Sequence, residues 1–154
     1  MRIKLIFKAK YLLLLLLLFI IGCQGTDPQV YARAKIKEKL TNIELAFNLS
    51  NLSGIMENYY DFFVQEEDGY PLDKADIEER WIQRLEIYAE LNIRQIEIDL
   101  VGNNWAIVSC ELVFFDGEEE YVWQEPSQEN GDISYFYKDL AGTWKICGKD
   151  YSGF

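Results

Sequence analysis

The sequence contains no histidine among its 154 residues. Histidine is the side chain that most often moves protons near neutral pH, and it activates the nucleophile in serine- and cysteine-dependent hydrolases. Its absence excludes Ser-His-Asp and Cys-His catalysis, and it excludes zinc sites that contain histidine. Any acid–base chemistry would have to use other groups, of which carboxylates and tyrosines are the candidates.

Cysteine is nearly as scarce, with residues at positions 23, 110 and 147. In a simple antiparallel meander at least one strand separates the strands of Cys110 and Cys147, which puts them two strand spacings of about 4.8 Å apart. A disulfide needs Cα atoms within about 7 Å, so only strong curvature of the sheet would allow the two to bond. Two separate buried thiols are the favoured interpretation. Two cysteines alone do not make a metal site, so the sequence predicts no metal and no cofactor.

Basic residues are fewer than acidic ones: the chain has 15 Lys and Arg and 26 Asp and Glu, which gives a formal net charge of −11. A surface this acidic repels nucleic acid and anionic lipid headgroups. We therefore expect no nucleic-acid partner. Solubility is the simplest reason for the excess charge.

The first 22 residues have a composition of their own, with four basic residues, no acidic residue and an apolar run at 11–21. A basic start followed by an apolar segment of about 7–15 residues is typical of a secretory signal peptide. A membrane-spanning helix needs about 20 apolar residues, roughly twice this length. The pattern predicts a signal peptide at residues 1–22.

The apolar run ends in Ile20-Ile21-Gly22-Cys23, which resembles the lipobox of bacterial lipoproteins. The resemblance implies cleavage between Gly22 and Cys23, a diacylglyceryl thioether on Cys23, and often a further acyl chain such as palmitate on the new amino terminus. Two or more chains give stable membrane anchoring. Residues 23–29 would then be a lipidated tether, and the protein would be extracytoplasmic, on the outer membrane if the host has two membranes.

Removal of residues 1–22 takes away four of the 15 basic residues and none of the 26 acidic ones, which moves the formal net charge from −11 to −15. The polypeptide itself would be repelled by an anionic leaflet. The lipid therefore has to provide the anchoring.

Hydrophobic periodicity divides the remaining chain into a helical half and a strand half. Apolar residues recur every three or four positions up to residue 91, and from residue 93 they alternate. Asp73 or Asp76 can cap the third helix, and Asp116-Gly117 is a hairpin signal. The expected helices are 30–49, 54–64 and 77–91, and the expected strands are 93–101, 105–115, 120–124, 133–139 and 143–149. This order predicts an α+β fold, with N-terminal helices packed on one face of a curved antiparallel sheet.

Three segments, 51–63, 101–108 and 136–146, carry a family resemblance. Their hydrophobic patterns look like the NTF2-like (cystatin-related cone) superfamily, so residues 30–154 would form one NTF2-like domain. Such a resemblance implies a sheet that wraps a helix and leaves a pocket. The superfamily includes isomerases, dehydratases, transport factors and non-enzymatic domains, so it does not fix a function.

Aromatic residues exceed what one small core requires, and some are expected to line a pocket or an interface. The candidates are Tyr59, Tyr60, Phe63, Trp81, Tyr88, Trp105, Trp123, Tyr135 and Tyr137. No catalytic residue is assigned, and the favoured interpretation is a non-catalytic domain that binds an envelope protein or a small apolar ligand.

Two alternatives remain open at this point. The first is an isomerase- or dehydratase-like enzyme with a buried carboxylate and a tyrosine, for which Asp99 with Tyr59 or Tyr60 would serve. A solvated face of the sheet is the favoured interpretation of Asp99. The second alternative is a structural homodimer formed through the sheet.

Overall fold

The computed structural model describes residues 27–127 and 131–152. The chain divides into two units, Met1–Tyr31 and Ala32–Phe154, and the second unit carries the fold. The predicted signal peptide and the lipobox with Cys23 lie outside the described residues. No helix within the described ranges is long and apolar enough to cross a membrane.

The longest helix, α2, spans Pro28–Asn48. Its buried residues recur at steps of one helical turn, which places them on one stripe: Ala32, Ile36, Leu40, Ile43, Ala46 and Phe47. This stripe packs into the hydrophobic core, and the predicted helix at 30–49 is confirmed. The chain then turns at Ser50, which has a positive φ of 52°.

The second helix is shorter than predicted, because α3 spans only Leu52–Met56. The backbone beyond it pairs with the last strand: the N–H of Tyr60 donates to the carbonyl of Ile146 at 2.8 Å, and Tyr59 and Ile146 form a parallel bridge. Tertiary pairing thus replaces the last turns of the predicted helix, although its apolar residues have helical spacing.

Helix α4 spans Lys74–Ile87 and begins with a capping box. The side chain of Asp73 accepts from the N–H of Asp76, and the Asp76 side chain accepts from the N–H of Asp73. Both acids named from the sequence therefore act in one cap. The helix ends four residues before the predicted boundary at Leu91, because Leu91 belongs to strand β3.

In the part of the chain that the structure describes, the main sheet has five antiparallel strands: β3 (Glu90–Val101), β4 (Trp105–Phe115), β5 (Glu120–Glu125), β6 (Tyr135–Lys138) and β7 (Trp144–Ile146). Strand β4 is central. It pairs with β3 along one edge, and along its other edge with β5 near Phe115 and with β6 near Trp105. Strand β7 pairs with β6 on the side away from β4.

A small hairpin lies between α3 and α4, in a segment for which the sequence predicted no strand. Strands β1 (Gln65–Glu67) and β2 (Tyr70–Leu72) pair around Asp68-Gly69. Glycine at position 69 has a φ of 81°, and Asp68 is also left-handed at 52°. The strands expected from the sequence begin only at residue 93, so this hairpin was not predicted.

The outer edge of β3 is covered by polar side chains of α2. Asn48 accepts from the N–H of Leu91 and donates to its carbonyl, at 2.8 and 3.0 Å. Glu44 accepts from the N–H of Ile93, and Arg33 donates to the carbonyl of Ile98. These contacts pair groups that an open sheet edge would leave exposed to another chain.

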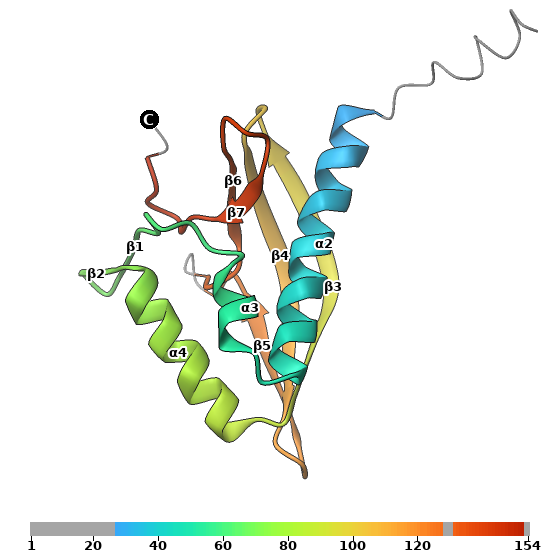
Figure 1. Ribbon diagram of the computed structural model, residues 1–154, viewed down its shortest axis with the longest axis vertical. Coiled ribbons are helices and arrows are strands. Elements are labelled where there is room, and N and C mark those ends of the chain that lie inside the picture. The colour runs from blue at the N-terminus through green and yellow to red at the C-terminus, as the bar shows by residue number, and fades with distance from the viewer. Residues whose placement is uncertain (1–26, 128–130, 153–154) are drawn as a thin grey trace, which may run out of the picture. The chain divides into compact units, whose positions relative to one another are not determined.

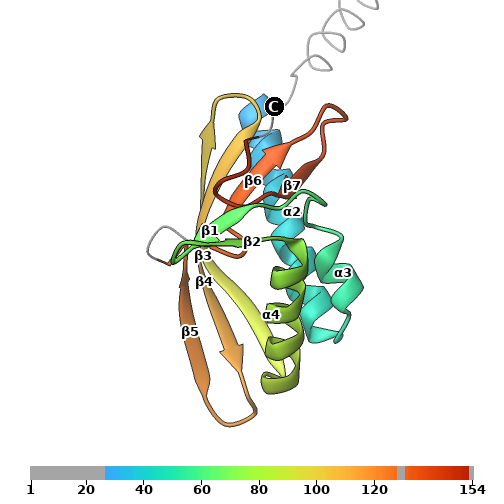
Figure 2. The ribbon, with the colours of Figure 1, turned by 90° about the vertical axis from the view of Figure 1, so that its left-hand side faces the viewer.

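Among the described residues of the second unit, the helices lie on one face of the sheet and none lies on the other (Figures 1 and 2). The core fills the space between these layers, and its largest buried members are Trp81, Tyr59, Phe47, Phe63, Phe114 and Phe136. A β-bulge between Arg94 and Glu97, with Gln95 at a φ of 54°, bends strand β3. The predicted α+β class with helices on a curved antiparallel sheet is confirmed.

Candidate functional site

A polar cavity of about 460 Å³ lies beside the core, where α4 faces β1, β5 and the chain that enters β6. Its lining contains four acidic and two basic side chains. The described lining residues are Glu67, Asp68, Arg80, Arg84, Trp123, Gln124, Glu125, Ser127, Gly131 and Asp132.

The two arginines reach this cavity because Arg80 and Arg84 are one turn apart on α4. Trp81 lies next to Arg80 and points into the core, where it is fully buried. The helix therefore presents its apolar side to the core and its guanidinium groups to the cavity.

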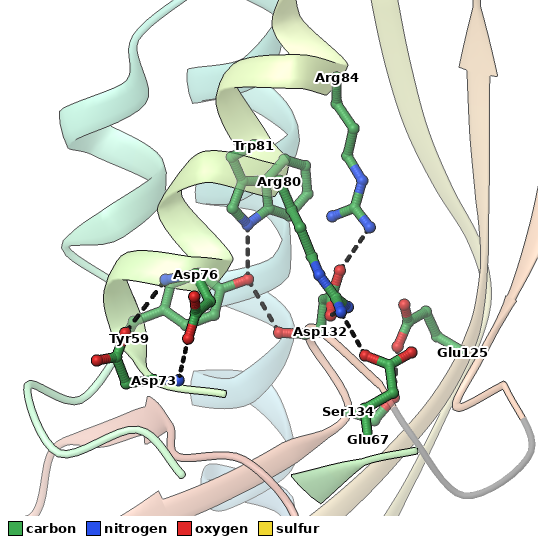
Figure 3. A network of polar contacts seen from close by, with 10 residues as sticks. All are labelled: Tyr59, Glu67, Asp73, Asp76, Arg80, Trp81, Arg84, Glu125, Asp132 and Ser134. Atoms are coloured by element: carbon green, nitrogen blue, oxygen red, sulfur yellow. Dashed lines mark hydrogen bonds and ion pairs between the residues drawn. The ribbon is translucent and has the colours of Figure 1, made fainter. Parts of the chain in front are cut away.

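Asp132 is the centre of the ion-pair network in Figure 3. Arg80 Nη1 lies 2.9 Å from Asp132 Oδ1, and Arg84 Nη2 pairs with Asp132 Oδ2. Arg80 also pairs with Glu67 of β1. The side chain of Asp132 is only 4% exposed, so its charge depends on these two guanidinium groups for compensation.

Arg84 is held by aromatic rings as well as by Asp132. Its Cζ lies 4.8 Å from the ring centre of Trp81 and 5.1 Å from that of Trp123. Its buried Nη1 makes no hydrogen bond among the described residues. Stacking on aromatic faces stabilises a guanidinium in such surroundings, so Arg84 is a fixed part of the cavity wall.

A buried chain of hydrogen bonds connects the core to the same loop. Trp81 Nε1 donates to Tyr59 Oη at 2.8 Å, and Tyr59 Oη donates to the backbone carbonyl of Asp132 at 2.9 Å. Burial raises the pKa of Tyr59 well above its usual value. The tyrosine hydroxyl is fully buried and has both partners within the protein, so it positions Asp132 and is not available to a molecule in the cavity.

Glu125, at the end of β5, is an acid whose pKa is raised well above the usual value. Burial, and secondarily the charge of Asp132, raises its pKa from 4.5 to about 7, against the opposing hydrogen bond from Ser134 Oγ at 3.0 Å. A side chain at Gly131 would meet both Glu125 Oε2 and Ser134 Oγ. Glycine at this position therefore allows the backbone of residue 131 to lie against the Glu125 carboxyl group.

The nine aromatic residues proposed from the sequence divide into three groups. Tyr59, Phe63 and Trp81 are core residues. Tyr88 and Trp123 lie on the inner side of the sheet, with their ring centres 6.0 Å apart. Trp123 also lines the cavity. The remaining four, Tyr60, Trp105, Tyr135 and Tyr137, lie outside the cavity lining.

Asp99, the acid considered for catalysis, is exposed and pairs in register with Ile107 on the face of the sheet opposite the core. It cannot meet Tyr59, which is buried on the inner side. The preferred interpretation of Asp99 as part of a solvated face is confirmed. Cys110 and Cys147 are free and buried, as expected.

Sequence reasoning missed the polar residues that form the site, namely Glu67, Arg80, Arg84, Glu125, Asp132 and Ser134. One signal was present: Arg80 and Arg84 are four residues apart and flank the buried Trp81. Glu67, Glu125 and Asp132 lie between the expected helices and strands, so only the folded chain could place them. In the described ranges, no group of three acidic or cysteine side chains is arranged to hold a metal ion.

No family model and no curated protein sequence matches the chain. Solved structures do resemble it. An NTF2-like protein of unknown function from Shewanella oneidensis has a TM-score of 0.58 at 17% identity, covering 75% of this chain and 94% of that one. The fold is NTF2-like.

Two further structures with this NTF2-like fold carry names of enzymes. A protein from Novosphingobium aromaticivorans, provisionally named a scytalone dehydratase, has a TM-score of 0.55 at 10% identity over 82% of this chain and 92% of that one. A ketosteroid isomerase-like protein from Erwinia carotovora has a TM-score of 0.50 at 18% identity, over 74% and 89%. At these identities the likeness establishes the fold alone.

Proposed function

We propose that this protein is a lipid-anchored, extracytoplasmic binding protein whose NTF2-like domain holds a small polar ligand without transforming it. The anchor is proposed from the lipobox that ends at Cys23. The binding role is proposed from the cavity between α4 and β5, whose ion-pair network is complete before any ligand enters. That preformed network is the observation that supports the proposal most strongly, because pre-organised sites bind at lower entropic cost.

The charges of the cavity favour a ligand that is cationic or rich in hydrogen-bond donors. Both arginines are already paired with Asp132, and Arg80 also with Glu67. Asp68 and Glu125 then remain as acceptors in the lining. Trp123 adds an aromatic face against which a cation or an apolar edge of the ligand can pack.

A ligand assay can use three four-carbon molecules that differ in charge: putrescine, butanediol and succinate. We expect calorimetry to show binding of putrescine, weaker binding of the diol and none of succinate. Putrescine should bind more tightly at pH 8 than at pH 6, because Glu125 loses its proton near pH 7 and gains a negative charge.

The variant Glu125→Gln should lose this pH dependence, and Glu97→Gln, on the exposed face of β3, is the matched control. Preferential binding of succinate, or a failure of putrescine to bind, would contradict the proposed ligand class.

A second function, acid–base catalysis, is favoured by one observation. A carboxyl group with a pKa of about 7 that lines a cavity has the properties of a general acid or base. Tyrosine is missing from the described lining, so the acid–tyrosine pair expected for a cone-fold enzyme is not assembled there. Deuterium exchange at the α-carbon of small ketones, followed by NMR, separates the two functions: exchange above the buffer rate that Glu125→Gln abolishes would establish catalysis.

The anchor has its own test. Cys23→Ser should move the protein from the membrane fraction to the soluble fraction, because the thiol that would carry the diacylglyceryl group is gone. Gln24→Ser is a matched control that leaves the cysteine in place. Retention of the Cys23→Ser protein in membranes after signal cleavage, or a mature amino terminus without acyl groups in mass spectrometry, would refute the anchor.

A further inference from the structure

The two ends of the main sheet are far apart and are marked by different turns. Strand β4 has eleven residues, which at 3.3 Å each amounts to roughly 36 Å. At its Trp105 end lie the β3–β4 turn and the β6–β7 turn, joined by a hydrogen bond from the N–H of Lys138 to the carbonyl of Asn104. The β4–β5 turn lies at its Phe115 end (Figure 1).

Within the second unit, helix α2 runs from Ala32 toward the Phe115 end of the sheet. Arg33, early in α2, donates to the carbonyl of Ile98, three residues before the end of β3. Asn48, the last residue of α2, bonds to Leu91, which pairs with Phe114. The tether therefore joins a helix whose early residues lie at the end that carries the β6–β7 turn.

The two ends differ in charge, and both carry exposed apolar side chains. Leu140 in the β6–β7 turn is fully exposed, and Val101 before the β3–β4 turn is half exposed. The outer face beside them carries an aromatic cluster of Tyr60, Trp105, Tyr137 and Tyr151, in which Trp105 and Tyr137 have ring centres 5.1 Å apart. At the far end, four of the five residues in 116–120 are acidic.

We propose that the β6–β7 end of the domain docks on the lipid bilayer, with Leu140 and the aromatic cluster as its contact surface. This inference rests on the proposed anchor at Cys23. Five residue steps separate Cys23 from Pro28, where α2 begins, so an extended tether reaches about 17 Å at most. A tether this short keeps the early part of α2 close to the membrane.

The chemistry of the surface supports a bilayer as its occupant. Tryptophan and tyrosine are favoured at membrane–water interfaces because their rings are apolar and their edges are polar. An exposed leucine at a turn can enter the upper acyl region. The acidic β4–β5 turn would be repelled by anionic headgroups, so charge also directs that end away from the membrane. Asp139 lies in the docking turn, but its Oδ1 accepts the N–H of Thr143 and stabilises the turn.

A fluorescent reporter can measure the orientation in the full, lipidated protein. We would place one cysteine at the docking end by Ala141→Cys, which keeps Leu140, and one at the far end by Glu118→Cys. Burial raises the pKa of both Cys110 and Cys147 to about 12, so these thiols resist labelling at neutral pH. A maleimide fluorophore then labels the introduced cysteine, because the anchor converts Cys23 to a thioether.

The labelled proteins are bound to vesicles of phosphatidylcholine and phosphatidylglycerol that contain a quencher attached to lipid. We expect a blue shift and loss of fluorescence for the label at position 141 and no change for the label at position 118. Adding Leu140→Asp to the Ala141→Cys protein should restore the fluorescence, and Asn103→Asp in the neighbouring turn is a charge-matched control on a polar residue.

Each other outcome has a definite meaning. Vesicle flotation of the protein with both labels unquenched would overturn the docking while the anchor stands. Equal quenching at both positions would overturn the orientation. Failure to float, together with labelling of Cys23, would overturn the anchor and the docking that rests on it. A blue shift at position 141 that depends on protein concentration and not on lipid would assign the surface to a second copy of this chain instead.

Discussion

The protonation of Glu125 makes the stability of this protein depend on pH in an unusual direction. The pKa of the carboxyl group rises from 4.5 to about 7 on folding. An acid with a raised pKa binds its proton more tightly in the folded state, so the free energy of unfolding falls as pH rises through this range. The difference in pKa corresponds to roughly 3 kcal/mol, as an upper value for a carboxyl group that is almost completely buried.

The absence of histidine makes this effect measurable by itself, because no histidine titrates between pH 5 and pH 8. The pKa values of Asp116, Glu38 and Asp61 are lowered, so these acids titrate below that window. We expect the free energy of unfolding to fall by roughly 2–3 kcal/mol between pH 5 and pH 8.

The substitution Glu125→Gln tests this directly. Glutamine is nearly isosteric and keeps an oxygen for the hydroxyl of Ser134, but it does not ionise. Urea denaturation followed by tryptophan fluorescence should give a nearly constant free energy of unfolding for the variant over the same pH range. The variant should exceed the parent by about 2 kcal/mol at pH 8 and match it near pH 5.

Glu97→Gln, at an exposed position, should keep the pH dependence of the parent. A parent protein with constant stability between pH 5 and pH 8 would refute the reasoning, and so would a Glu125→Gln variant that retains the same slope.

Two further substitutions test the contacts around the site and the sheet edge. Asp132→Asn removes the buried negative charge that Arg80 and Arg84 share, so we expect a loss of about 3–5 kcal/mol in urea denaturation, with Asp68→Asn nearly neutral. It should also lower the pKa of Glu125, visible as a smaller change in stability between pH 5 and pH 8, and an unchanged slope would contradict the coupling. Asn48→Ala leaves the N–H and carbonyl of Leu91 unpaired and should cost about 2–4 kcal/mol, whereas Asn42→Ala on the exposed side of α2 should cost little. Equal losses of stability for the two asparagine variants would show that the edge of β3 does not depend on the hydrogen bonds from Asn48.

Local patterns were sufficient for the order of the longer helices and of the strands of the main sheet, because periodicity and turn residues act over short distances. The stripe from Ile36 to Phe47, the cap at Asp73 and the alternation in β3 all follow from neighbouring residues. The helix expected at residues 54–64 is shorter in the structure because of a contact with a distant part of the chain. Its spacing is helical, yet the backbone of Tyr59 and Tyr60 pairs with Ile146, which lies more than eighty residues away.

The fold class, the exclusion of histidine chemistry and the prediction of a lipid anchor could all be read from the chain, since each depends on composition or on adjacent residues. Which charges lie next to one another depends on the folded chain. Asp132 joins Arg80 and Arg84 across about fifty residues of chain, and Glu125 becomes protonated near neutral pH because the fold removes its carboxyl group from water. Burial and long-range Coulomb interactions are properties of the assembled chain, and no local pattern encodes them.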